Sequence, residues 1–282
     1  MAVAAALAPH VETVGRLAAL GRGPDAAIDL GEAALLLASF DRPEAALDDY
    51  RRHLRAQAAA VAETHATLGP DSLDTRCRAL ATALVEREGF HGDRATYDDL
   101  ANANLMAVID RRRGLPVALG ILYIDAGRRQ GWTIEGINFP GHFLVRLEHE
   151  GERALVDPFG EGERVDIADL RALVRLGGGG ELLPQHYAPL GNRGILLRLE
   201  NNIKQRLIGA GEPERAVEIL ERMLLVAPGE PQLLREAGLL HRALGNLKAA
   251  LGHFERLAAS GPEPRLGREV NRLIEELRGR MH

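Results

Sequence analysis

Apolar residues recur at helical spacing over most of the first 113 residues. The run LGEAALLLASF has this spacing, and the tripeptide DRP then interrupts it. The next amphipathic stretch, PEAALDDYRRHLRAQAAAVAETHATLG, ends at the dipeptide GP. Asp71 or Ser72 is placed to cap the helix DSLDTRCRALATALVERE, which should end at Gly89. Residues 1–113 are therefore predicted to be an N-terminal helical region of the core.

The pattern changes between residues 114 and 190. LPVALGILYIDAGRRQG reads as one helix with Pro116 in its first turn, where a missing N–H does no harm, and Gly131 ends it. TIEGINF and HFLVRLEHEGERALVDPF then alternate with the two-residue period of strands, and Glu150-Gly151 is a plausible hairpin turn. A helix followed by antiparallel strands predicts an α+β core.

Residues 191–282 return to a helical pattern that repeats itself. Four consecutive glycines at 177–180 predict a mobile joint before it. Three pairs of residues are separated by 34 positions, the tetratricopeptide period: Gly211 and Gly245, Ala216 and Ala250, and Pro228 and Pro262. Two repeats and a last helix are fewer than the ~3 repeats that a free-standing array needs. We therefore expect this all-α tail to pack on the core.

Composition narrows the classes of function. The 282 residues carry a net charge of −5, so no basic field favours nucleic acid. No apolar run approaches the ~18–20 residues of a membrane span, and the apolar start lacks the positive region of a signal peptide. A single cysteine excludes an internal disulfide framework and fits a reducing compartment. We expect a cytoplasmic protein that binds neither nucleic acid nor membrane.

No metal or cofactor is predicted. The ten histidines are scattered, and His241 and His253 lack the i, i+4 spacing of a helical metal site.

His142 and Asp157 are the strongest candidates for chemistry. Alternation in PGHFLVRL places His142, Leu144 and Arg146 on one strand face, and a hairpin near residue 150 would bring Asp157 roughly opposite His142. An aspartate in that position can accept the Nδ1 proton and stabilise the imidazolium. On the pattern alone, a purely structural His–Asp hydrogen bond is the favoured interpretation, because histidines on strands have many uses.

At this point the sequence resembles a known family. The motifs R-x-G-L-P, P-G-H-F-L-V-R and V-D-P-F, in this order, resemble the SirB family of transglutaminase-like proteins, and the resemblance spans roughly residues 30–260. It implies a transglutaminase/papain-like core, with a central helix against an antiparallel sheet, N-terminal helices and a tetratricopeptide tail. Active members of that superfamily have a cysteine at the head of the central helix, followed by histidine and aspartate on adjacent strands.

The resemblance also implies a degenerate triad. His142 and Asp157 occupy the histidine and aspartate positions, whereas the cysteine position falls on Pro116. Neither Val117 nor Ala118 beside it offers a nucleophile. Covalent acyl transfer needs that nucleophile, so we expect a non-catalytic, regulatory protein that holds a protein or peptide in the old cleft or on the tail. The pattern leaves the oligomeric state open.

An enzyme remains the competing hypothesis. Cys77 is flanked by Arg76 and Arg78, which could lower its pKa, although it lies in the middle of a helix and gains nothing from the helix dipole. A hydrolase or amidase would then use Cys77, or a water molecule activated by His142.

Four further positions are candidates for binding. Arg113, with the two arginines before it, precedes the central helix and could form an anion site there, or simply a solvated turn. Asn104 is placed to cap a helix or to hold the loop over the pocket. Gly141 and Phe143 flank His142.

Overall fold

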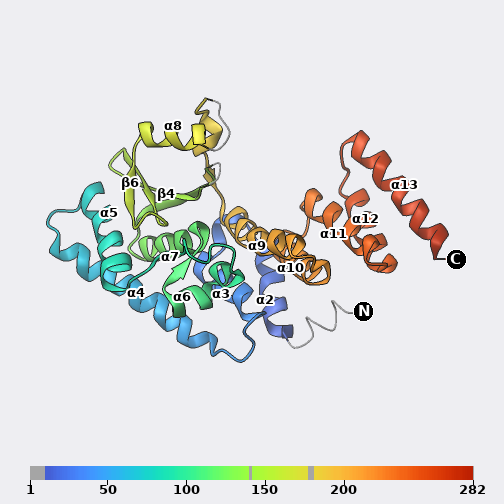
Figure 1. Ribbon diagram of the computed structural model, residues 1–282, viewed down its shortest axis with the longest axis horizontal. Helices are drawn as coiled ribbons and strands as arrows, with labels where there is room; N and C mark the ends of the chain where they lie inside the picture. Colours follow the sequence, from blue (N-terminus) through green and yellow to red (C-terminus); the bar gives the residue numbers. More distant parts are fainter. Residues whose placement is uncertain (1–9, 140–141, 177–180, 282) are drawn as a thin grey trace. The chain divides into compact units, whose positions relative to one another are not determined.

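The chain divides into two compact units. The computed structural model describes residues 10–139, 142–176 and 181–281. One unit consists of residues 28–199, and the other of residues 1–27 with 200–282 (Figure 1). The first helix, α2 (Val11–Arg22), therefore belongs to the same unit as the C-terminal helices, which the sequence pattern does not predict. Gly141 and the four glycines at 177–180 lie outside the described residues.

Helix starts in the larger unit follow local capping chemistry. The Glu32 N–H donates to Asp29 Oδ1 at the start of the first helix of this unit. Ser72, one of the two predicted caps, forms a capping box with Thr75. The elements that precede the central helix are α3 (Leu30–Ser39), α4 (Leu47–Thr67), α5 (Leu73–Ala81) with its π-helical continuation η3 (Thr82–Arg87), η4 (Leu100–Ala103) and α6 (Leu105–Arg111).

The central helix packs on a five-stranded antiparallel sheet. This helix, α7 (Pro116–Arg129), has Pro116 at its first position, as predicted. The strand order is β6-β5-β4-β3-β7. The strands are β3 (Thr133–Ile137), β4 (Leu144–His149), β5 (Glu152–Asp157), β6 (Glu163–Val165) and β7 (Pro189–Leu190). A short parallel pair joins β1 (His91–Gly92) to β2 (Arg113–Gly114), and β2 lies just before α7 in the chain. The fold is thus α+β.

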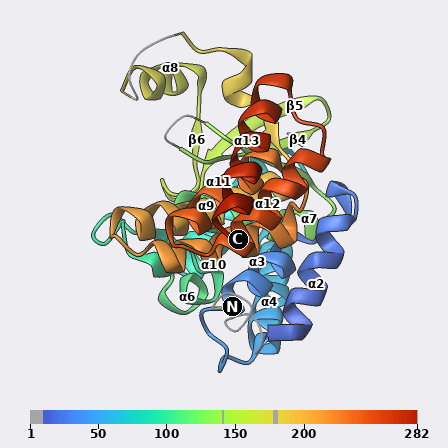
Figure 2. The same ribbon diagram turned by 90° about the vertical axis from the view of Figure 1, so that its right-hand side faces the viewer.

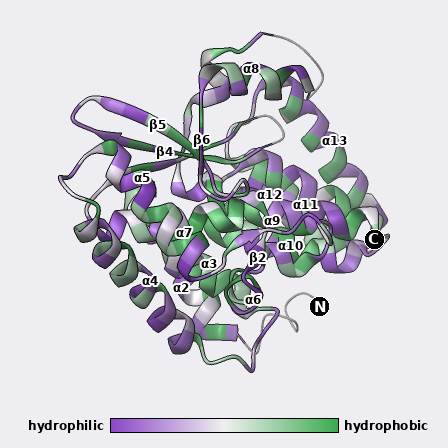
Figure 3. Cartoon of the chain, turned by 60° about the vertical axis from the view of Figure 1, so that its left-hand side comes forward, coloured by the Kyte–Doolittle hydropathy of each residue, from purple (hydrophilic) through white to green (hydrophobic). Residues whose placement is uncertain are grey.

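The β4–β5 hairpin confirms the predicted turn and alternation. Glu150 and Gly151 both have positive φ, 49° and 84°, as a two-residue turn requires, and His149 pairs with Glu152. Val145 and Leu147 are fully buried on the face toward α7. On the opposite face, Leu144 joins a hydrophobic cluster with α8 (Ile167–Leu176). Figure 3 shows α7 and α8 on opposite sides of the strands, with α7 largely hydrophobic.

The 34-residue repeat is visible in the smaller unit. Gly211 and Gly245 have nearly equal φ angles of 74° and 77°, and Ala216 and Ala250 are both fully buried. The helices after the core are α9 (Asn192–Gly209), which runs through the boundary between the units, α10 (Pro213–Val226), α11 (Pro231–Ala243), α12 (Leu247–Ala259) and α13 (Pro264–Arg280). The last three, orange to red in Figure 2, follow one another through short turns and pack in sequence.

Helix α2 packs closely on α10. A Cβ added to Gly21 would lie 2.0 Å from the carbonyl oxygen of Leu225, so the two backbones meet at a point where only glycine fits. A short 3-10 turn, η2 (Asp25–Ala27), follows α2, and another, η5 (Pro184–Tyr187), precedes β7. In the described part of the chain, no helix has the length and hydropathy to cross a membrane.

Candidate functional site

The head of α7 is held by the loop in front of it. The Leu115 N–H donates to the carbonyl oxygen of Asn102 at 2.8 Å, and Gly114 pairs with Gly92 across the β1–β2 ladder. Pro116 stands at the first helical position without an N–H of its own. The start of the helix is therefore held by backbone hydrogen bonds to the preceding loop. The family resemblance assigns a nucleophile to this position, and Pro116 is not one.

Asp157 ends β5 and is fixed by its own turn. Its Oδ1 accepts the Phe159 N–H at 2.9 Å, and its carbonyl oxygen accepts the Gly162 N–H at 2.9 Å. A Cβ on Gly160 would lie 2.9 Å from Asp157 Oδ2, so the turn closes tightly around the carboxylate. The V-D-P-F motif thus encodes a turn in which the aspartate caps the backbone that follows it.

His142 is positioned through its backbone. Its N–H donates to the Phe139 carbonyl oxygen at 3.0 Å, and its own carbonyl oxygen accepts a hydrogen bond from Arg198 Nη2 at 2.7 Å. The next residue, Phe143, is fully buried, and its ring packs directly on two glycines. A Cβ added to Gly120 would lie 2.3 Å from the Phe143 ring, and a Cβ added to Gly136 would lie 2.5 Å from it. Phe143 is therefore a packing residue that anchors the segment carrying His142, and it has no free surface for a ligand.

His142 and Asp157 are diagonal neighbours across the hairpin. The pairing of Val145 with Val156 places Asp157 opposite Leu144, one pleat away from His142. Among residues 10–139, 142–176 and 181–281, no hydrogen bond or ion pair joins the two side chains. The strand pairing thus brings the pair into the same neighbourhood but does not form the hydrogen bond that would fix a histidine tautomer.

Phe159 links this neighbourhood to the head of α7. Its ring lies against Gly92, where a Cβ would come within 2.5 Å, and Tyr97 meets it edge-on at 5.9 Å between centroids. The Arg94 guanidinium lies 5.2 Å from the same ring. Because Gly92 pairs with Gly114, the turn of Asp157 and the start of the central helix pack around one loop, residues 91–104.

Asp93 fastens that loop. It is 2% exposed, and it accepts hydrogen bonds from the Thr96 hydroxyl at 2.6 Å and from the Thr96 and Ala95 N–H groups. The Thr96 hydroxyl and N–H are the main reason that the pKa of Asp93 falls to about 2. The carboxylate therefore remains ionised and holds the loop at any pH near neutral.

Tyr123 is a residue that the sequence interpretation missed. It lies on α7, two turns after Pro116, and is fully buried. Burial raises the pKa of its phenol, and the nearby charges of Asp157 and Glu161 raise it further. Within the described residues its hydroxyl has no hydrogen-bond partner. A phenol hydroxyl within the apolar run of α7 was the signal that could have identified it.

The other predicted site residues have separate places. Asn104 caps α6: its Oδ1 accepts the Ala107 N–H at 3.1 Å, and its Nδ2 donates to the Ala38 carbonyl oxygen at 2.9 Å. Arg113 is exposed on β2. Arg111 pairs with Asp93, at 3.3 Å, and with Asp99. Gly141 lies outside the described residues.

Cys77 is not activated. It is 3% exposed in the middle of α5, and burial raises the pKa of its thiol to about 11 despite a lowering influence from Arg164. Arg76, which the sequence suggested as an activator, forms hydrogen bonds to Asp71 through Nε and Nη2, each at 2.7 Å. The expectation that flanking arginines lower this pKa is therefore wrong, because burial of the thiol disfavours the thiolate and sets the direction of the shift.

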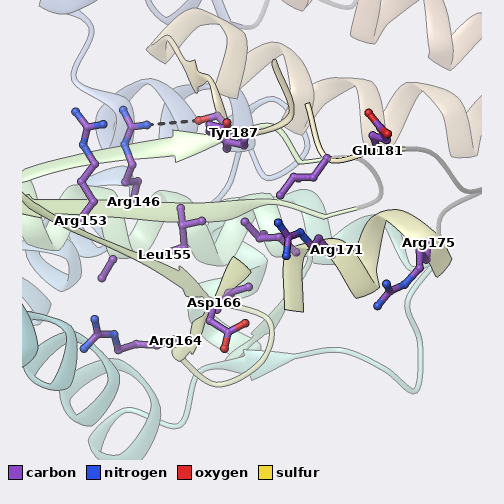
Figure 4. Close-up of a pocket in the computed structure, with 13 residues that line it drawn as sticks. Arg146, Arg153, Leu155, Arg164, Asp166, Arg171, Arg175, Glu181 and Tyr187 are labelled. Carbon is purple, nitrogen blue, oxygen red and sulfur yellow. Dashed lines mark hydrogen bonds between the residues drawn. The ribbon is translucent and has the colours of Figure 1, made fainter. Parts of the chain in front are cut away.

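A pocket opens on the sheet face that carries α8. It has a volume of about 1050 Å³ and lies between β4, β5, β6, α8 and the segment after residue 180 (Figure 4). Its acidic lining residues are Asp166 and Glu181. Its basic lining residues are Arg146, Arg153, Arg164, Arg171 and Arg175. His142, Asp157 and Pro116 are not among the lining residues, so this pocket is distinct from the triad positions.

The arginines of the pocket differ in their pairing. Arg146 forms ion pairs with Glu135, at 2.5 Å, and Glu148, at 3.1 Å. Arg171 and Arg175 project from α8 and are exposed. In the described part of the chain, neither of these two forms an ion pair or a hydrogen bond. Two guanidinium groups one helical turn apart are thus available to carboxylates from outside the molecule.

Comparison with known proteins identifies the family. Residues 47–201 match the model described as "Transglutaminase-like superfamily", and residues 203–277 match "Tetratricopeptide repeat". A UPF0162 protein of Xylella fastidiosa is 30% identical over 244 residues, covering 82% of this chain and 84% of the relative. The chain belongs to this SirB-type UPF0162 family of transglutaminase-like proteins.

Other relatives lie within and beyond that family. A UPF0162 protein of Pseudomonas aeruginosa is 33% identical over 214 residues, covering 72% of this chain and 78% of the relative. "F-box only protein 21" of Mus musculus is 27% identical over 133 residues, which cover 44% of this chain and 21% of that protein. The predicted transglutaminase-like core and tetratricopeptide tail of this UPF0162 protein are thereby confirmed.

Proposed function

We propose that this UPF0162 protein is non-catalytic and acts as a regulatory module that binds an acidic segment of a protein partner. Pro116 carries the first part of the proposal. Covalent acyl transfer needs a thiol or hydroxyl at the head of α7, and proline has neither. The next two residues of the helix, Val117 and Ala118, offer no nucleophile in its place.

Two observations weigh against the hydrolase alternative. With a pKa of about 11, the Cys77 thiol is protonated near neutral pH and is a poor nucleophile. A water-based hydrolase would need an oriented His142 ring, and no carboxylate in the described residues hydrogen-bonds to it. Both routes lack the group that would start the reaction.

The arginine-lined pocket supports an acidic partner. The whole chain carries a net charge of −5, yet this pocket contains five arginines and two acids. Guanidinium groups bind carboxylates through paired hydrogen bonds, and Arg171 and Arg175 are available for such contacts. The tetratricopeptide tail is a second surface for the same partner, because such repeats generally mediate protein–protein contacts. We place this activity in the cytoplasm, where the single free thiol of Cys77 fits a reducing compartment.

A peptide titration tests the binding. A fluorescein-labelled peptide of alternating Asp and Gly should bind the full chain, and a Ser-Gly peptide of equal length should not. The double variant Arg171→Gln/Arg175→Gln should bind the acidic peptide roughly 10-fold more weakly, because two charge-assisted contacts are lost. Arg52→Gln/Arg55→Gln, which removes two exposed arginines of α4, is the matched control and should bind as the wild type does. Equal binding by both double variants would refute the pocket.

A turnover assay tests the absence of catalysis. The full chain is incubated with a panel of amide and ester substrates, and the His142→Ala variant is run in parallel. We expect no turnover above buffer from either protein. Turnover by the wild type that disappears in His142→Ala would refute the non-catalytic assignment while leaving the peptide result untouched.

A further inference from the structure

Three consecutive helices of the smaller unit place one side chain each at a common point. Glu221 comes from α10, His241 from α11 and His253 from α12. Glu221 Oε1 lies 3.0 Å from His241 Nε2 and 2.7 Å from His253 Nε2. One donor atom from each of the three residues lies within 4.8 Å of the others. Nothing in the family comparison assigns these residues a role.

The two histidines of the cluster are buried, and the Glu221 side chain is partly buried. His241 is 2% exposed and His253 is 6% exposed. The two rings are nearly parallel, with an interplanar angle of 11° and 5.3 Å between centroids, so both Nε2 atoms converge on the same carboxylate. Buried imidazole and carboxylate groups are desolvated at a cost, and the protein must compensate that cost with partners.

The partners in the described residues are incomplete. His253 Nδ1 is buried and has no hydrogen-bond partner among them. The Asn246 side-chain nitrogen lies 3.5 Å from His241 Nδ1, a long contact. Because amide orientation is an assignment, Asn246 can equally present its oxygen and accept a proton from His241 Nδ1. In that arrangement the proton is on Nδ1, so Nε2 of His241 is free to bind a metal. The hydrogen bond from Nδ1 to Asn246 then holds the orientation of the ring.

We propose that Glu221, His241 and His253 form a Zn²⁺ site. Imidazole nitrogen and carboxylate oxygen are donors that Zn²⁺ accepts, and three protein ligands leave a fourth position for water or an external donor. Zn–N and Zn–O distances of about 2.0–2.2 Å in a tetrahedron require ligand atoms roughly 3.3 Å apart. The two hydrogen-bonded separations reach that value by opening about 0.3–0.6 Å, a shift within the reach of side-chain torsions. One divalent ion also balances the charge of the partly buried Glu221 carboxylate.

Such an ion would link the helices of the short repeat array to one another. Its ligands join α10 to both helices of the next 34-residue repeat, so binding cross-links the two repeats. A tail of two repeats and α13 has less interface than longer arrays, and a metal is one way in which small units gain stability. This role is independent of the peptide pocket and of the triad positions.

Metal titration of the full, untagged chain tests the site. After treatment with a chelator, the wild type should bind Zn²⁺ with one-to-one stoichiometry in calorimetry, and its melting temperature should rise. Glu221→Gln keeps the size of the side chain but removes the anionic ligand, and it should bind at least about 100-fold more weakly. Glu214→Gln, which changes an exposed carboxylate on the same helix, should bind as the wild type does.

A spectroscopic readout decides the case even if Glu221→Gln fails to fold. Co²⁺ added to the wild type should give the intense visible bands of low-coordinate N/O ligation, and Zn²⁺ should shift two buried histidine signals in the NMR spectrum. Absence of saturable binding, shifts confined to other histidines, or equal affinity of Glu221→Gln and wild type would each show a hydrogen-bonded cluster only and would overturn the proposal.

Discussion

The two histidine sites of this UPF0162 protein differ in what holds their side chains. His142 is fixed through its backbone, by Phe139 and Arg198, and in the described residues its ring is not hydrogen-bonded to Asp157. His241 and His253 are fixed through their rings, which share the Glu221 carboxylate. His142 thus lies in a sequence motif typical of an enzyme family, but in the described residues its ring lacks the hydrogen bond to Asp157 that a catalytic triad needs. His241 and His253 belong to no such motif, yet both rings are hydrogen-bonded to one carboxylate.

The difference teaches that a retained motif and a formed site are separate properties. P-G-H-F-L-V-R is explained to a large extent by packing, since Phe143 fills a hole that two glycines leave open. The V-D-P-F turn is explained by the hydrogen bond between Asp157 and the Phe159 N–H. Residues at the histidine and aspartate positions of the family can therefore be kept because the fold depends on them.

The largest effect should come from removing the packing under His142. Phe143→Ala should lower the free energy of unfolding by about 3–5 kcal/mol, because it leaves a cavity against Gly120 and Gly136. Urea denaturation measures this loss. Phe254→Ala is the matched variant, since Phe254 is also fully buried and lies against Gly238 in the smaller unit. A loss below about 1 kcal/mol for Phe143→Ala would contradict the packing explanation of the motif.

The reactivity of Cys77 separates a packed thiol from a catalytic one. Its pKa is raised from 9.0 to about 11, so the thiolate fraction near neutral pH should fall about 100-fold. Iodoacetamide should therefore alkylate the native protein at least about 100-fold more slowly than the urea-denatured chain, with a rate that rises up to about pH 11. Fast alkylation of Cys77 in the native protein at pH 7 would support the thiol-enzyme hypothesis. It would then no longer hold that the His142 site lacks the groups of an enzyme.

The smaller effects concern single carboxylates, beginning with Asp93 in the loop of residues 91–104. Asp93 has a pKa lowered from 3.8 to about 2, so ionisation favours the folded state. Its contribution is present above about pH 4 and is lost as the pH falls toward about 2. Asp93→Asn should thus cost about 2 kcal/mol at pH 7 and much less near pH 2, as measured by urea denaturation across pH.

Asp71 provides the control for burial. Its pKa is also lowered to about 2, chiefly by the hydrogen bonds from Arg76, but its side chain is 46% exposed. Solvent screens that pair, so Asp71→Asn should cost less than about 1 kcal/mol. Equal losses for Asp71→Asn and Asp93→Asn would mean that the loop is not held by a buried carboxylate.

Local pattern was enough to predict the fold and the neighbourhood of the triad positions. Alternation of apolar residues set the faces of β4, and the Glu150-Gly151 turn set its register with β5. The proline at the first position of α7 and the 34-residue spacing of Gly211 and Gly245 depend on backbone rules within a few residues. Such features are local, so a single sequence contains them.

The rest depends on contacts between distant segments. The glutamate-histidine cluster combines positions 20 and 32 residues apart, on three helices, and no spacing rule selects them. The pKa of Cys77 depends on how deeply α5 is buried, which its flanking arginines do not reveal. His142 and Asp157 do not form a hydrogen bond because the strand register places Asp157 opposite Leu144, two residues from His142. The alternation of apolar residues does not specify the register to within two residues.

The contact between Gly21 and Leu225 has a consequence for biosynthesis. A ribosome releases α2 first, yet the helix against which it packs is made only after the entire larger unit has been synthesised. The smaller unit can therefore be completed only after residues 28–199 have been synthesised. Translation order thus leaves the apolar face of α2 without its packing partner until α10 has been synthesised.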